Sequence, residues 1–297
     1  MTIYTHAESN IRKTWFLITL FFILIIGIGW SLSYYFESPM ILVYAVIFSL
    51  IINITSYWYS DKIILAMTKA QPIKKQDNPE LYRIVENLCI TAGLPVPRIY
   101  ILPEMQPNAF ATGRNKNHAV IAVTQGLLQK LDKVELEGVI AHELSHVGNK
   151  DMLLMTVVVV LVGLISIVAD IFTRSMFFGS FRKNDNDRNE SGQLGAILAI
   201  LGLVLIVLSP IIASLIQLAI SRKREFLADA SGVLLTRYPE GLASALEKIS
   251  QDKTPLKQNF TATAHLYISN PIKKKDFLQI FATHPPVEQR IKAIREM

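Results

Sequence analysis

The sequence predicts a mainly α-helical, polytopic membrane protein that also carries a smaller α+β domain. Three observations predict this class. Hydrophobic residues make up 51% of the 297 residues, and many of them lie in four long uncharged runs. A stretch with strand-like and helix-like patterns separates the second run from the third. Two histidines at helical spacing stand just before the third run.

The first two hydrophobic runs, residues 15–36 and 40–57, are expected to cross a lipid bilayer. A bilayer core about 30 Å thick is spanned by about 20 helical residues. The surrounding chain has too few amphipathic segments to bury both runs in a soluble core. Only three residues link the runs, and no small-residue cleavage site precedes the second run, which argues against a cleaved signal peptide. Residues 1–60 are therefore predicted to form a transmembrane hairpin.

The second pair of runs, residues 152–169 and 194–220, predicts two more hydrophobic helices. With the polar patch at 182–193 between them, they define a predicted membrane segment at 152–220. The prediction is therefore four hydrophobic helices, and two soluble segments, 61–151 and 221–297, that together form the α+β domain.

The basic residues predict the orientation of the chain, because lysine and arginine are enriched in cytoplasmic loops. They flank both outer ends of the first hairpin and follow the fourth run, which places these segments in the cytoplasm. The polar link between the third and fourth runs is also basic, in disagreement with two full spans. Two alternatives remain: the charge bias is overridden there, or this pair is a re-entrant hairpin packed within the protein.

The soluble segment at 61–151 is predicted to hold a helix that starts at Asn78-Pro79 and ends at Gly93. A strand at 98–102 and a β-hairpin follow, and the two hairpin strands are joined by a five-residue polar turn. One hairpin strand could bind an extended peptide by strand addition, and a purely structural sheet is the alternative. The candidate substrate-binding residues on this strand are Asn108, Ala109, Phe110 and Ala111.

The chemistry is predicted by the motif His142-Glu143-Leu144-Ser145-His146. Positions i and i+4 share one helix face, so both imidazoles can bind one Zn²⁺ ion. Glu143 lies beside them and can take a proton from a water, an arrangement typical of zinc peptidases. The alternative is two helical histidines that are satisfied by hydrogen bonds. Asp132 and Glu135 predict a capping box at the start of this helix.

A catalytic zinc site needs a third protein ligand. A third histidine just downstream is excluded, because Asn149 and Met152 stand where the metzincin pattern has Gly and His. Glu225 and Asp229 share a helix face, so Glu225 can complete a gluzincin-type His₂Glu site for one zinc ion per chain. Asp229 can hold the free ring N–H of a liganding histidine. A surface ladder with the neighbouring arginines is the alternative.

Other features carry weaker indications. His284, followed by two prolines, and Arg290 in the last helix could contact substrate or the transition state, and an exposed turn is the alternative. The net charge of +6 is explained by basic residues that flank membrane segments, so no nucleic-acid partner is predicted.

The combined motifs at 108–113, 142–146, 225–229 and 283–286, with the membrane helices, resemble the HtpX membrane metalloproteases, relatives of the CaaX prenyl proteases. The resemblance covers essentially the whole chain. It implies zinc ligands at His142, His146 and Glu225, and a catalytic role for Glu143. It also implies cleavage of misfolded or damaged membrane proteins at the cytoplasmic face of the bacterial inner membrane.

Two rival functions stay open at this point. One is a prenyl-protein protease of the CaaX type, and the other is a non-enzymatic zinc-binding membrane scaffold or chaperone. A structural zinc is usually closed by four ligands that include cysteines, whereas this chain has a single cysteine, Cys89, far from the motif. Self-cleavage in the cytoplasmic loops is an expected side reaction of the protease.

Overall fold

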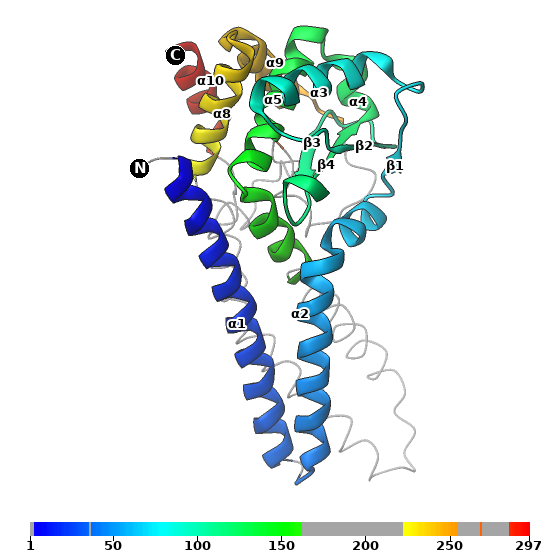
Figure 1. The fold of residues 1–297 in the computed structure, drawn as a ribbon, viewed down its shortest axis with the longest axis vertical. Coiled ribbons are helices and arrows are strands. Elements are labelled where there is room, and N and C mark those ends of the chain that lie inside the picture. Colours follow the sequence, from blue (N-terminus) through cyan, green and yellow to red (C-terminus); the bar gives the residue numbers. More distant parts are fainter. Residues whose placement is uncertain (1–2, 36, 162–221, 255–267, 269–284) are drawn as a thin grey trace.

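The computed structural model describes residues 3–35, 37–161, 222–254, 268 and 285–297. The described part is mainly helical. It consists of a long two-helix stalk and a compact head that holds the sheet and the shorter helices (Figure 1). The stalk is formed by α1 (Ile3–Tyr35) and α2 (Pro39–Met67), which pack along each other.

The predicted N-terminal hairpin is present. Ser9–Tyr34 and Pro39–Met67 are each long and apolar enough to cross a membrane. Large apolar side chains such as Trp30, Ile23 and Ile51 point outward along the stalk and are more than half exposed, which suits a lipid environment.

Only the first part of the third predicted run is described, as the helix Asp151–Leu161. It follows α5 (Lys133–Gly148) after a bend of 87°, and the two helices together could also count as one broken or re-entrant span. The rest of that run, the polar patch and the fourth run lie outside the described residues, so the alternatives of a full span and a re-entrant hairpin stay predictions.

The head contains a four-stranded sheet in the order β1-β2-β4-β3. The strands are β1 (Gln71–Pro72), β2 (Arg98–Leu102), β3 (Ala109–Thr112) and β4 (Val120–Thr124). The predicted hairpin is confirmed as the antiparallel pair β3–β4, in which Ala109 pairs with Val123. The link between the strands, residues 113–119, is longer than the predicted five-residue turn and contains the 3-10 helix η1 (Lys116–His118). β2 and β4 are parallel, and β3 is an edge strand of the sheet.

Two helices of the head, α3 (Pro79–Ala92) and α5, begin at the predicted signals. α3 is capped by the Asn78 side chain, which accepts from the Leu81 amide, and it ends at Gly93 with a left-handed φ of 64°. α4 (Gln125–Lys130) then leads to α5, whose predicted capping box between Asp132 and Glu135 is present. The remaining helices are α8 (Arg222–Thr236), α9 (Pro239–Gln251) and α10 (Val287–Arg295).

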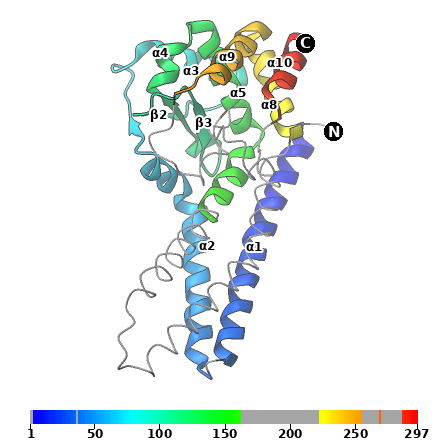
Figure 2. The same ribbon diagram turned by 180° about the vertical axis from the view of Figure 1, so that it is seen from behind.

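Helix α5 lies at the centre of the head. It packs against α3 and β3, and against α8 and α9 from the second soluble segment (Figure 2). Its residues from Val139 to Val147 are all buried, and Val139, Ile140, Ala141 and Leu144 anchor it in the main core cluster. The two soluble segments, far apart in sequence, therefore share one core built around the motif helix.

Candidate metal centre

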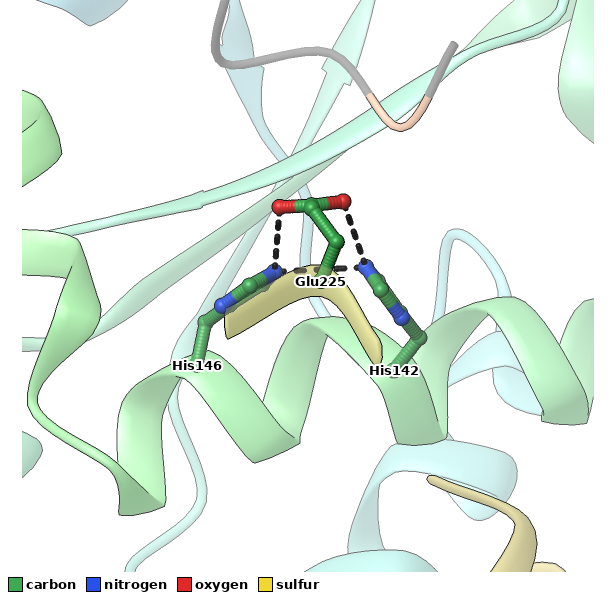
Figure 3. A group of neighbouring side chains, drawn as sticks. All are labelled: His142, His146 and Glu225. Atoms are coloured by element: carbon green, nitrogen blue, oxygen red, sulfur yellow. Dashed lines mark hydrogen bonds and ion pairs between the residues drawn. The ribbon is translucent and has the colours of Figure 1, made fainter. Parts of the chain in front are cut away.

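The three predicted ligands come together in the head. His142 and His146 extend from one face of α5, and Glu225 extends towards them from the first turn of α8 (Figure 3). The two histidine Nε2 atoms are 3.2 Å apart. The Glu225 oxygens lie 3.9 Å from His142 Nε2 and 3.8 Å from His146 Nε2. All three side chains are buried.

The arrangement fits a divalent transition metal. Tetrahedral zinc with Zn–N bonds of about 2.0–2.1 Å requires two nitrogen ligands to be about 3.3 Å apart, close to the observed distance between the histidines. The carboxylate is about half an ångström farther away than this geometry requires. Two imidazoles and one carboxylate are a donor set that zinc accepts, and three protein ligands leave one position for water or substrate.

Close packing of α8 on α5 brings Glu225 to the histidines. A Cβ atom on Gly232 would lie 3.0 Å from the backbone nitrogen of His142, so only glycine allows this approach without displacement. Gly232 is therefore a part of the site that the spacing of the ligands alone did not indicate.

A carboxylate lies against the Nδ1 atom of each of the two histidines. His142 Nδ1 lies 2.9 Å from Asp229 Oδ1, as the sequence predicted for Asp229. His146 Nδ1 lies 3.2 Å from Asp151 Oδ2, a contact that the sequence analysis missed. Asp151 directly precedes the third hydrophobic run. A charged residue beside such a run is costly unless it has a partner, so its position in the sequence already indicated that Asp151 has one.

These carboxylates shift the protonation of the site. Burial alone would lower the pKa of His146, but the hydrogen bond with Asp151 and the negative charges of Glu225 and Asp151 raise it to about 9. Burial alone would raise the pKa of Asp229, but the positive charge and hydrogen bonds of Arg290 lower it to about 2. Asp229 is thus a permanent anion behind His142.

Glu143 is buried beside the ligands. Burial raises the pKa of Glu143, and the neighbouring histidines and the backbone N–H of Ala111 act in the opposite direction. Because α5 packs on β3, this carboxylate faces the edge strand. A carboxyl group with a raised pKa next to a metal site has the properties of a general base.

Arg290 is fully buried behind the ligands. Its guanidinium binds both oxygens of Asp229, at 2.8 and 2.6 Å, and lies 3.5 Å from Glu225 Oε2. The same side chain donates to the carbonyl of Ile268 at 2.9 Å. The structure therefore places Arg290 as the partner of Asp229. His284, the other candidate contact, lies outside the described residues.

The candidate substrate strand lies next to the site. Phe110 is buried in the core, and the Asn108 amide donates to Thr124 Oγ1 at 2.9 Å. On the outer edge of β3, the Ala109 carbonyl already accepts a hydrogen bond from the Ile268 amide at 3.2 Å. The Ala109 end of the outer edge is therefore covered by Ile268, and the part of the edge that lies beside Glu143 is at Ala111.

A buried HExxH helix that shares a His-His-Glu group with a second helix, in a chain with two apolar N-terminal helices, defines a membrane-associated metalloprotease. Residues 75–297 match the family described as Peptidase family M48. The chain belongs to this family, as the resemblance of its motifs predicted.

Relatives support the same assignment over the whole chain. A "Protease HtpX homolog" of Caldanaerobacter subterraneus subsp. tengcongensis is 44% identical over 100% of this chain and 98% of the relative. One of Lactobacillus helveticus is 43% identical over 99% of this chain and 100% of the relative. One of Pyrococcus furiosus is 45% identical over 92% of this chain and 91% of the relative.

A solved structure shows the same fold. The crystal structure of S. mikatae Ste24p has a TM-score of 0.51 and 18% identity, and the match covers 98% of this chain and 67% of that chain. At this identity the likeness concerns the fold alone. The family implies a metal ion, and the His-His-Glu group is where the described residues could hold one.

Proposed function

We propose that this protein is a zinc-dependent endopeptidase of the cell membrane that hydrolyses misfolded or damaged membrane proteins at the cytoplasmic face. The observation that carries the proposal is the convergence of His142, His146 and Glu225, with Glu143 beside them, in a head that joins two membrane-length helices. The printed name of the relatives, a protease, supports the reaction class.

His142, His146 and Glu225 would hold the ion. A zinc ion there would supply Lewis-acid chemistry, lowering the pKa of a water and polarising the scissile carbonyl. Glu143 accepts the proton of the attacking water and returns it to the leaving amine, and its raised pKa suits both transfers. No serine or cysteine nucleophile is required.

The surrounding charges keep the ligands in place. Asp229 and Asp151 fix the ring orientation of the two histidines, so that the Nε2 atoms face one another. Arg290 holds Asp229 by two hydrogen bonds and balances its charge in the buried site. Arg290 also lies 3.5 Å from Glu225 Oε2, so its positive charge faces both buried carboxylates.

The position of the site supports membrane-bound substrates. His146 lies near the end of α5, directly before the helix Asp151–Leu161 that belongs to a hydrophobic run. A polypeptide pulled partly out of the membrane would reach the edge strand β3 at Ala111, next to Glu143. Self-cleavage is also expected, because the site would face the cytoplasmic loops of the protein itself.

The test compares wild type with Glu143→Gln, both purified as full chains in detergent. Zinc content, casein cleavage and cleavage of an unfolded membrane protein are measured. We expect one zinc per chain in both proteins and proteolysis only in wild type, with turnover of the variant lower by about 10²–10⁴-fold. A prenylated CaaX peptide serves as competing substrate. Its preferred cleavage would replace the proposed substrate class, and zinc binding without any proteolysis would favour the scaffold.

A further inference from the structure

The N-terminal membrane helix reaches the metal centre through one side chain. Asn10, near the start of α1, is only 3% exposed. Its Nδ2 atom donates to Asp151 Oδ1 at 2.6 Å and to the Asn149 carbonyl at 3.3 Å. Its Oδ1 atom accepts from Arg224 at 3.0 Å. The side-chain amide of Asn10 thus donates to the segment Asn149–Asp151 and accepts from the first turn of α8.

Both segments carry a proposed metal ligand. Asp151 contacts Asn10 with one carboxylate oxygen and His146 Nδ1 with the other. Arg224 is the chain neighbour of Glu225 at the start of α8. Asn10 is therefore one side chain away from a histidine ligand and one residue away from the carboxylate ligand. Figures 1 and 2 both show the beginning of α1 beside the beginning of α8.

The environment makes these contacts costly to lose. Asp151 and Arg224 are both almost fully buried, and the Arg224 Nε atom is 3.8 Å from Asp151 Oδ1, too far for a direct hydrogen bond. Asn10 forms a hydrogen bond with both of them, at 2.6 Å to Asp151 and at 3.0 Å to Arg224. A buried charged group that loses its hydrogen-bond partner moves to find another, and Asp151 cannot move without releasing His146.

We propose that Asn10 is a positioning residue of the metal centre: through Asp151 and Arg224, α1 sets the places of His146 and Glu225. This inference rests on the proposed metal site. It assigns the membrane helix a part in the active centre besides anchoring the chain. Asparagine suits the position because aspartate would place a second carboxylate against Asp151, and an apolar residue would offer neither donor nor acceptor.

The test uses full-length protein in detergent with N10A, the isosteric N10D, and T14A as matched control. Thr14 is also buried in α1, one turn further on, and the one bond of its hydroxyl among the described residues is to the carbonyl of Asn10 in its own helix. Three readouts are taken: zinc affinity by competition with a chelator, the visible spectrum of the Co²⁺-substituted site, and the unfolding midpoint of the metal-free protein.

We expect zinc affinity to fall about tenfold in N10A, the lower end of the range for residues that support metal ligands. N10D should lose at least as much, because Asp151 loses its donor although the volume is kept. Both should change the Co²⁺ spectrum, and T14A should match wild type. If N10A does not fold, the zinc affinity and the Co²⁺ spectrum of N10D alone test the positioning role.

Wild-type zinc affinity and an unchanged Co²⁺ spectrum in N10A and N10D would overturn the inference and leave the proposed protease intact. A wild-type protein that binds no zinc would instead overturn the proposed function. A lower unfolding midpoint with unaltered affinity and spectrum would show that Asn10 supports the fold only, which also rejects the positioning role.

Discussion

At the scale of single residues, the proposed metal centre depends on two carboxylates, Asp229 and Asp151, that contact the rings of His142 and His146. Glu225→Ala should remove zinc binding, because two histidines alone do not hold the ion firmly. Asp229→Asn should weaken zinc binding by about 10–100-fold, because the ring of His142 loses its charged partner. Chelator competition measures both. Glu247→Ala, at an exposed position of α9, is the control. A Glu225→Ala protein with wild-type affinity would mean that the third ligand is another residue.

The raised pKa of His146 predicts opposite effects of pH on metal binding and on metal-free stability. In the metal-free fold a proton occupies His146 below about pH 9. A ligand must lose this proton, so zinc affinity should fall by about tenfold per unit as the pH drops below 9. Because the folded pKa lies above the ordinary value of 6.5, the metal-free stability from this group is complete below 6.5 and is lost as the pH rises through 9.

Zinc titrations and thermal unfolding of the metal-free protein, each between pH 6.5 and 9, check this prediction. Asp151→Asn should flatten both dependences, because the hydrogen bond with Asp151 is the largest contribution that raises the pKa of His146. Zinc affinity that does not change over this interval would contradict a protonated His146 in the metal-free site.

The convergence of His142, His146 and Glu225 could be predicted from the sequence because the candidate ligands follow helical spacing, which is local. Asp229 was found in the same way. Asp151 and Asn10 were missed because their roles arise from segments distant in sequence that meet only in the fold. Arg290 was a candidate contact for substrate or the transition state, and the structure places its guanidinium against Asp229. These two bonds depend on the packing of α10 against α8, which no local pattern encodes.

At the scale of elements, the crossing of α5 and α8 fixes the distance between the ligands. Gly232→Ala should push α8 away from His142, because the added Cβ would lie 3.0 Å from a backbone nitrogen that cannot yield easily. We expect a loss of about 1–3 kcal/mol in unfolding free energy and weaker zinc binding. Gly148→Ala is the matched control, since its Cβ would meet only the end of Leu94 at 3.9 Å.

Thermal unfolding and chelator competition for zinc, measured on both glycine variants, test whether the close approach at Gly232 places Glu225. Gly148→Ala should be neutral or slightly stabilising, as expected for alanine in place of glycine in a helix. Equal behaviour of both variants would show that the close approach at Gly232 is not what places Glu225.

Most elements of the head could be predicted because their signals are local. The capping box, the Asn78 cap, the Gly93 stop and the β3–β4 hairpin are all read from neighbouring residues. The parallel pairing of β2 with β4 was not predicted, because it depends on which strands meet after the hairpin has formed. β1 has only two residues, too few to show the alternating pattern of a strand.

At the scale of the whole molecule, the stalk and the head form one unit if α1 positions the ligands. Removal of residues 1–37 should then lower zinc affinity even in detergent, where membrane anchoring no longer matters. The sequence alone favours a different result, in which the hairpin serves membrane placement and its loss leaves the zinc site little changed. The structure favours the first result because Asn10 contacts Asp151 and Arg224 directly.

A chain whose residues 15–34 are replaced by leucine, with Asn10 kept, separates anchoring from positioning. It retains a membrane-length helix and the contacts of Asn10 with the head, so its zinc affinity should stay close to wild type. The truncated chain should lose affinity by about the same factor as N10A or more, within the range of about 10–100-fold for supporting residues. Chelator competition on both proteins is the measurement. A truncated, folded protein with wild-type zinc affinity would confine α1 to anchoring, because the head would then hold His146 and Glu225 in place on its own.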